Sequence, residues 1–193
     1  MIRLFSIFFK MDFNTLPTAL DLFNAAYKNF NRYKKGCPKC KAKGFLKPFA
    51  GYDHNLVDYC NKSILEGHVE IRRLSCSSCQ GTFGVLPDIF IPHKSYNIIF
   101  ILKVLKAYYC RTGTVEALCR QFGISTSTFY AWKKRYLIHK SLYLGSLAKY
   151  FYKTDPHLNE LCNICLTPFL HHFFNRFGFS FLQYSKTAEY GST

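Results

Sequence analysis

Acidic residues and long apolar runs are both scarce in this sequence. Only 11 aspartates and glutamates stand against 26 lysines and arginines, which leaves a formal net charge of +15 over 193 residues. The most apolar stretches are residues 1–11, which are too short for the roughly 20 residues of a membrane span, and residues 95–109, which two lysines interrupt. We therefore expect no signal peptide, no membrane role and a cytoplasmic location.

The positive charge falls into two blocks. Residues 1–50 and 93–140 each carry about +8, whereas residues 51–92 carry about −2 and residues 141–193 about +1. Such blocks attract polyanions, either nucleic acid or anionic lipid, without giving sequence specificity. One cluster contains no acidic residue and is expected to track phosphate groups, with a merely solvated face as the alternative: Lys28, Arg32, Lys34, Lys35, Lys39, Lys41, Lys43 and Lys47.

Four of the nine cysteines form two identical pairs. Cys37 and Cys40 lie in "GCPKC", and Cys76 and Cys79 lie in "LSCSSC". Two such pairs form knuckles that bring four thiolates into a tetrahedron, so the spacing predicts one structural Zn²⁺ in a zinc ribbon. The gap between the pairs exceeds the usual 15–20 residues, so we expect an insertion at residues 54–67.

Other interpretations of the cysteines stay open. A thioredoxin-type redox pair needs a helix after Cys37, yet Gly44 and Pro48 follow where that helix would run. Unliganded thiols are the remaining alternative for the two pairs. Three other cysteines are expected as small buried hydrophobes: Cys60, Cys110 and Cys119.

A second metal site is a further possibility near the end of the chain. Cys162 and Cys165 precede His171 and His172 with a spacing that would permit metal binding. The same stretch is rich in leucine and aromatic residues, so a packed helical tail accounts for it equally well.

Residues 111–136, "RTGTVEALCRQFGISTSTFYAWKKRY", predict two short helices that follow a supporting helix at residues 96–110. Thr114 is expected to cap the first of them, Gly123 to end it, and Ser125 to cap the second. Phe129 and Trp132 then point to the core. A Gly-containing turn of this length between short helices is typical of a helix-turn-helix.

The outer face of the second short helix carries small polar and basic side chains. Serines and threonines near a helix N-terminus permit close approach to phosphates or bases, and basic side chains hold phosphates without reading bases. The predicted DNA contacts are Ser125, Thr126, Ser127, Tyr130, Lys133, Lys134 and Arg135, with Arg120 as a further phosphate contact. An ordinary helical hairpin with a solvated basic face is the alternative.

Three stretches together resemble a known layout: "GCPKC", "RRLSCSSCQGTFGVLPDIFIPHKSY" and "GISTSTFYAWKKRY". They are similar to the zinc-ribbon and helix-turn-helix front half of transposases, and to an uncharacterised transposase-like family with that arrangement. The resemblance implies binding to DNA ends or targets, with catalysis in a separate carboxylate-rich domain. Residues 141–193 offer only Asp155, Glu160 and Glu189, too few residues to build that domain around two metal ions.

The sequence therefore predicts an α+β fold, mostly α, in four segments. These are an N-terminal helix in residues 1–34, a ribbon of short antiparallel strands in 35–92, a helix-turn-helix in 93–140 and a helical tail in 141–193. We expect a non-enzymatic, transposase-related or accessory protein of a mobile element. Its expected partners are double-stranded DNA and either a transposase or a second copy, with no small-molecule substrate. The alternatives are a zinc-stabilised RNA-binding or protein-interaction module, and a thiol oxidoreductase.

The N-terminal helix is expected from Thr18 to about Tyr33. Thr18 and Asp21 are spaced as a capping box, although Asp stands in place of the usual Glu or Gln. An inward apolar stripe is expected at helical spacing: Leu20, Phe23, Tyr27 and Phe30.

Overall fold

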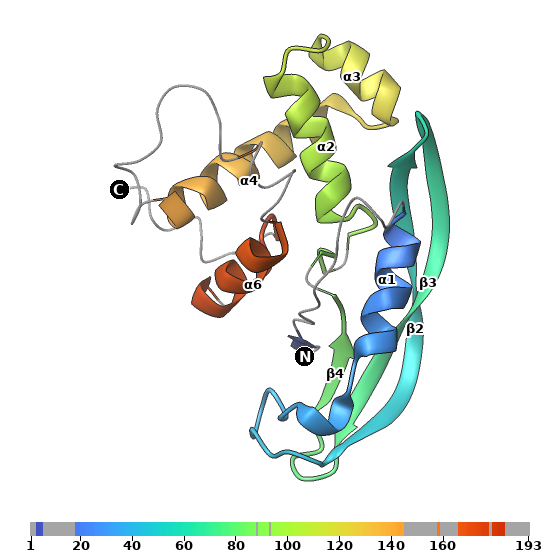
Figure 1. Cartoon of the computed structure of the whole chain (residues 1–193), viewed down its shortest axis with the longest axis vertical. Helices are drawn as coiled ribbons and strands as arrows, with labels where there is room; N and C mark the ends of the chain where they lie inside the picture. Colours follow the sequence, from blue (N-terminus) through green and yellow to red (C-terminus); the bar gives the residue numbers. More distant parts are fainter. Residues whose placement is uncertain are drawn as a thin grey trace.

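The computed structural model describes residues 3–5, 18–87, 89–92, 94–144, 158, 166–177 and 179–183. It is an α+β fold, as expected, and helical residues outnumber strand residues in the part described (Figure 1). The elements in chain order are β1 (Arg3–Phe5), α1 (Ala19–Asn29), the 3-10 helix η1 (Arg32–Lys34), β2 (Leu46–Cys60), β3 (Ser63–Cys76), β4 (Thr82–Val85), α2 (Ile98–Tyr109), α3 (Val115–Phe122), α4 (Thr126–Leu144) and α6 (Leu166–Phe177).

The sheet is dominated by one long hairpin. Its strand order is β1-β4-β3-β2, with β3 antiparallel to both β2 and β4, and with β1 parallel to β4. The expected short strands are wrong, because β2 has 15 residues and β3 has 14. Residues 54–67 are not a separate insertion but the far end of these two strands. Asn61 and Lys62 both have positive φ angles, 51° and 60°, as the tight two-residue turn of a twisted hairpin requires.

Helix α1 lies along β2 and is fixed there at its first turn (Figure 1). The Thr18 hydroxyl accepts a hydrogen bond from the Asp21 amide, which confirms the predicted cap. The Asp58 carboxylate on β2 accepts another from the Ala19 amide at 2.6 Å. The helix ends at Asn29, earlier than expected. Phe23 and Tyr27 of the predicted stripe are buried, whereas Leu20 is 48 % exposed, which corrects that position. The residues that α1 buries are Ala19, Leu22, Phe23, Ala26 and Tyr27.

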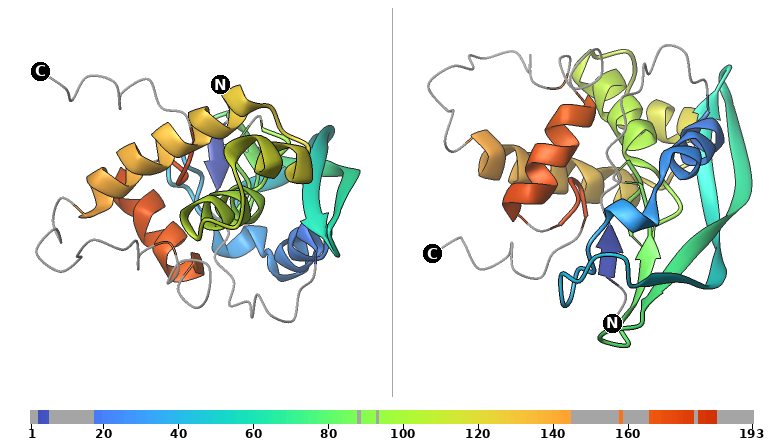
Figure 2. Two further views of the ribbon diagram at one scale, coloured as in Figure 1. Left: turned by 90° about the horizontal axis from the view of Figure 1, so that it is seen from above. Right: turned by 60° about the horizontal axis from the view of Figure 1, so that its bottom comes forward.

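The starts of α2, α3 and α4 and the end of α3 lie close to the predicted boundaries, but α4 has 19 residues and continues to Leu144, beyond the expected end at residue 136. Asn97 caps α2, Thr114 caps α3, and Gly123 ends α3 in the left-handed conformation with φ at 60°. The Ser125 hydroxyl accepts a hydrogen bond from the Thr128 amide at 3.1 Å and so caps α4. Figure 2 shows α4 leaving this unit as a long helix that runs toward α6.

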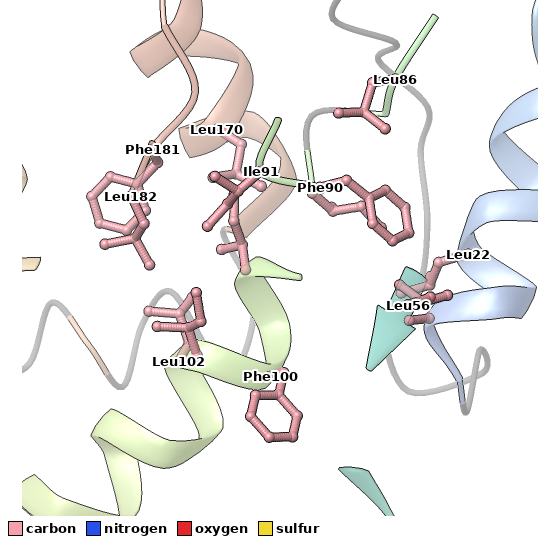
Figure 3. Packing of buried hydrophobic residues seen from close by; sticks show 14 of the residues in the cluster. Leu22, Leu56, Leu86, Phe90, Ile91, Phe100, Leu102, Leu170, Phe181 and Leu182 are labelled. Carbon is pink, nitrogen blue, oxygen red and sulfur yellow. The ribbon is translucent and has the colours of Figure 1, made fainter. Parts of the chain in front are cut away.

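One buried cluster connects the sheet with the helices. Figure 3 shows Leu22 and Leu56 on the sheet side, Phe90 between, and Phe100 and Leu102 on the side of α2. Phe129 and Trp132 are buried in the same cluster, as predicted. Near α6 it contains Leu170, Phe173, Phe181 and Leu182.

Two expectations concern the ends of the chain. Cys162 and Cys165, which would begin a second metal site, lie outside the described residues. Within the part of the chain that the structure describes, every helix is too short or too polar to cross a membrane.

Candidate metal centre and helical hairpin

Four cysteine side chains converge at one end of the sheet. Cys37 and Cys40 lie in the loop after η1, Cys76 ends β3, and Cys79 lies in the turn before β4. All four Sγ atoms lie within 4.8 Å of one another. The Cys37 and Cys79 sulfurs are 3.6 Å apart and the Cys40 and Cys76 sulfurs 3.8 Å apart. The two pairs that the sequence singled out therefore form one cluster of four thiols.

The two knuckles share one backbone geometry. The Cys37 amide donates to the Ala42 carbonyl at 2.9 Å, and the Cys76 amide donates to the Gly81 carbonyl at the same distance. The residue four positions after each first cysteine, Lys41 or Gln80, donates its amide to that cysteine's carbonyl at 2.8 Å. Both residues have positive φ angles, 64° and 56°, so each loop turns back at the same point. Each turn holds two sulfurs toward the common centre.

The surroundings of the sulfurs give two of the thiols different acidities. A hydrogen bond from the Ala42 amide lowers the pKa of Cys40 to about 7, and hydrogen bonds to the other three thiols act in the same direction. For Cys79 the Gly81 amide acts to lower the pKa, but lost hydration and the other three thiols raise it to about 11. Deprotonating all four thiols together is therefore unfavourable unless a cation compensates the charge.

The cluster can hold a metal ion, because its four sulfur ligands surround one point. Residues 38–40 form a turn and not a helix, so Cys37 lacks the helix N-terminus that a thioredoxin-type pair uses.

The other described cysteines lie outside the cluster. Cys119 is buried as expected, whereas Cys60 is only half-buried and Cys110 is exposed, which corrects that expectation.

The outer face of the α3–α4 hairpin carries most of the predicted DNA-contacting side chains. Ser125, Thr126, Ser127, Tyr130 and Lys134 are all exposed. The hydroxyls of Ser125 and Ser127 lie 2.8 Å apart and form a small polar network at the start of α4. These side chains are therefore available to a partner at the N-terminal half of α4.

Two of the predicted DNA-contacting side chains, Lys133 and Arg135, bind other parts of the protein instead. Lys133 is half-buried, and its Nζ donates to the Tyr108 hydroxyl at 2.8 Å while lying 4.5 Å from the centre of that ring. That hydrogen bond also raises the pKa of Lys133. Arg135 donates from Nη1 to the Leu182 carbonyl at 3.2 Å. Both side chains connect α4 to other helices or segments of the fold, which their position in the sequence did not reveal.

The four-cysteine cluster and the α3–α4 hairpin lie at opposite ends of the β2–β3 hairpin (Figure 1). Fourteen residues of β3, at about 3.3 Å each, correspond to roughly 45 Å of strand. At the far end Gln121 Nε2 donates to the Tyr59 hydroxyl at 3.2 Å, which joins β2 to α3. Sequence reasoning missed this contact, since no local pattern links residues 59 and 121.

Comparison with known proteins finds no matching curated protein and no matching solved structure. One family model matches part of the chain: residues 37–132 are similar to a family described as a domain of unknown function, DUF6431. This segment begins at Cys37 and ends at Trp132, so it includes the four-cysteine cluster, the long hairpin and the start of α4.

Proposed function

We propose that this is a zinc-containing DNA-binding protein in which α3 and α4 form a helix-turn-helix and α4 enters the major groove. One observation carries the proposal: the N-terminal part of α4 presents a polar, exposed face on one side, while its other side packs against buried residues of the core. Ile124, Phe129 and Trp132 are buried, and Trp132 contacts Phe100 of α2 with ring centroids 6.0 Å apart. A recognition helix needs such a fixed base, because small displacements would misplace its hydrogen bonds.

The chemistry of the exposed face suits a nucleic-acid duplex. Ser127, Tyr130 and Lys134 lie at positions i, i+3 and i+7, which place them on one side of α4. The first two are near the helix N-terminus, where small and polar side chains approach base edges or phosphates and the helix dipole favours anions. Arg120 on α3 is exposed and provides a phosphate contact beside them.

A structural zinc ion fits the four-cysteine cluster. Four sulfurs placed tetrahedrally about 2.3 Å from Zn²⁺ lie about 3.8 Å apart. Two of the sulfur–sulfur separations, 3.6 Å and 3.8 Å, agree with that spacing, and all four sulfurs lie within 4.8 Å of one another. Cys37, Cys40, Cys76 and Cys79 would hold the ion, and four protein ligands leave no open position for catalysis. The ion would compensate the thiolate charge and tie the two knuckles together.

The residue-level resemblance to the front half of transposases supports a transposase-related or accessory role without chemistry of its own. Such a protein would bind double-stranded DNA and associate with a transposase or with a second copy. An RNA-binding or protein-interaction module remains the alternative function, because basic surfaces attract every polyanion.

The test is selection of bound duplexes from a random pool by the full, zinc-loaded chain. Enrichment of one motif supports the proposal, and equal recovery of all sequences contradicts sequence reading by α4. The variant that tests the contact is Tyr130→Ala, whose side chain is 54 % exposed, so the variant should fold normally. We expect it to lose about 1–3 kcal/mol on the best site and little on random DNA.

A further inference from the structure

A second basic surface lies near the metal centre, far from α4. It is a groove of about 830 Å³ between the end of α1 with η1 on one side and the strands β2 and β3 on the other. That volume lies within the range of sites for nucleotide-sized ligands. The groove is separated from the α3–α4 hairpin by most of the length of the β2–β3 hairpin (Figure 1).

The charges of the groove suit an anion. Glu70 is its one carboxylate, so the lining carries a clear excess of positive charge. Anionic groups are drawn to a concave surface of this kind, because its walls concentrate the field. The cations that line it are Lys28, Arg32, Lys34, Arg72 and Arg73.

Two guanidinium groups in the groove have an unused donor. Nε of Arg32 and Nε of Arg73 are both buried and have no hydrogen-bond partner. One other nitrogen of each group has a partner: Arg32 Nη2 donates to the Tyr33 hydroxyl at 2.6 Å, and Arg73 Nη2 donates to Thr82 Oγ1 at 3.4 Å. Buried donors are rarely left unpaired in folded proteins, so these two point to a ligand that accepts hydrogen bonds. Phosphate oxygens match arginine in both charge and geometry.

Two exposed aromatic rings line the same groove. Tyr33 is 63 % exposed and Phe49 is 47 % exposed, although rings of this size are usually buried. Each ring has a guanidinium over it, Arg32 at 4.7 Å from the Tyr33 centroid and Arg73 at 4.9 Å from that of Phe49. Each guanidinium lies within cation–π distance of its ring, and about half or more of each ring residue stays exposed to a ligand in the groove.

We propose that this groove binds an unpaired segment of nucleic acid. Its arginines would hold the phosphodiester backbone while Tyr33 and Phe49 stack on bases. A duplex does not fit this chemistry, because paired bases are stacked inside the helix and cannot reach the rings. The inference stands on the groove alone, and it does not depend on α4 reading duplex DNA.

The test measures binding of labelled oligothymidine and oligouridine, each about 12 nucleotides long, to the full zinc-loaded chain by fluorescence anisotropy. Binding of either oligonucleotide supports the proposal, and binding of neither overturns it. Tyr33→Ala and Phe49→Ala should each weaken binding roughly tenfold and leave duplex affinity unchanged. The matched control is Phe45→Ala, which removes an equally exposed ring that does not line the groove and should leave single-strand affinity unchanged. Equal loss in all three variants would overturn the assignment to the groove.

A second set of variants distinguishes specific binding in the groove from non-specific electrostatic attraction to phosphates. Arg32→Lys and Arg73→Lys keep the charge but remove the unpaired Nε donor, and we expect each to weaken single-strand binding about tenfold. Full affinity in both variants, or equal affinity for an abasic strand with the same phosphates, would leave only a charge effect and overturn the proposal. Zinc content and thermal unfolding confirm that each variant is folded. Loss of duplex binding alone, with single-strand binding intact, would contradict the proposed function and leave this inference standing.

Discussion

The ring of Tyr59 on β2 packs against the ring of Phe122 on α3, with centroids 4.5 Å apart. Around this contact the Tyr59 carbonyl accepts a hydrogen bond from Lys103 Nζ at 3.0 Å. The Ile64 side chain on β3 lies so close to Gly123 that a Cβ atom there would clash with it. The far end of the β2–β3 hairpin therefore contacts the turn between α3 and α4, so the position of α4 is linked to strands whose other ends lie at the four-cysteine cluster.

Tyr59→Ala should destabilise the fold by about 2–3 kcal/mol, because it removes a partly buried ring from the junction of sheet and helices. Tyr59→Phe keeps the ring and loses only the hydrogen bond with Gln121, so it should cost less than about 1 kcal/mol. Urea unfolding curves of the three proteins measure both values. Equal losses in the two variants would show that the ring contact contributes nothing.

Cys76→Ser should abolish metal binding and much of the stability, because structural zinc contributes on the order of 10 kcal/mol in small modules. Cys76 is fully buried at the end of β3, where its backbone is fixed by the strand and by the knuckle that it begins, so the site cannot easily shift to accommodate a weaker ligand. The matched control is Cys60→Ser, which changes a half-buried thiol outside the cluster and should retain the metal. Metal content per chain and thermal unfolding measure the difference. Retention of zinc by Cys76→Ser together with its loss from Cys60→Ser would overturn the ligand assignment.

Local signals in the sequence predicted the parts of the fold that local interactions determine. Thr114, Gly123 and Ser125 act through hydrogen bonds within a few residues, so the limits of α3 and the start of α4 could be read correctly. The paired cysteines at Cys37 and Cys76 likewise begin loops whose own hydrogen bonds orient the sulfurs. The convergence of the four thiols followed from spacing alone.

Features that depend on distant parts of the chain were not predictable. The β2–β3 hairpin shifts its register between Phe49 and Tyr52 and then stays paired as far as Cys60. Near that far end Tyr59 contacts Gln121 of α3, and no local sequence pattern reveals this support. Lys133 and Arg135 were expected to face solvent. Lys133 instead bonds to Tyr108 and Arg135 to Leu182, and both partners are distant in the sequence. Leu20 was expected to be buried because it lies three residues before Phe23, but α1 packs through the face that carries Ala19 and Leu22. In each case tertiary packing outweighs the local pattern.

Stability should fall as the pH drops from about 6.5 to about 4, in part because of His139. This side chain is 1 % exposed, and burial, assisted by the charge of Arg135, lowers its pKa to about 4. Its Nδ1 accepts a hydrogen bond from the Leu182 amide at 2.8 Å, which requires the neutral ring. The folded state binds its proton more weakly than the unfolded chain, so the stabilisation is complete above pH 6.5 and is lost below it.

The measurement is the unfolding free energy between pH 7 and pH 4.5 for the wild type and for His139→Asn, whose amide oxygen can still accept from Leu182. Other acid-sensitive groups, including the four thiols, are present in both proteins, so the difference between the curves isolates His139. We expect the wild-type curve to be the steeper, by an amount that approaches about 3 kcal/mol at the lowest pH. Parallel curves would show that His139 is not the titrating group.

Lys134→Ala and Lys133→Ala should have different effects on duplex DNA binding, although the two residues are adjacent. Lys134 is exposed beside Tyr130 on α4, so its removal should weaken binding to every duplex about equally. It should also reduce the slope of log K against log salt concentration by about 0.9, the value of one phosphate contact. Lys133 Nζ is held by the Tyr108 hydroxyl at 2.8 Å, so its removal should leave that slope nearly unchanged and act mainly on stability.

Affinity measured at several salt concentrations on the folded proteins separates the effects of the two substitutions. An unchanged slope in Lys134→Ala would show that α4 does not contact phosphates through this side chain, and an equal reduction in both variants would mean that Lys133 leaves Tyr108 when DNA binds.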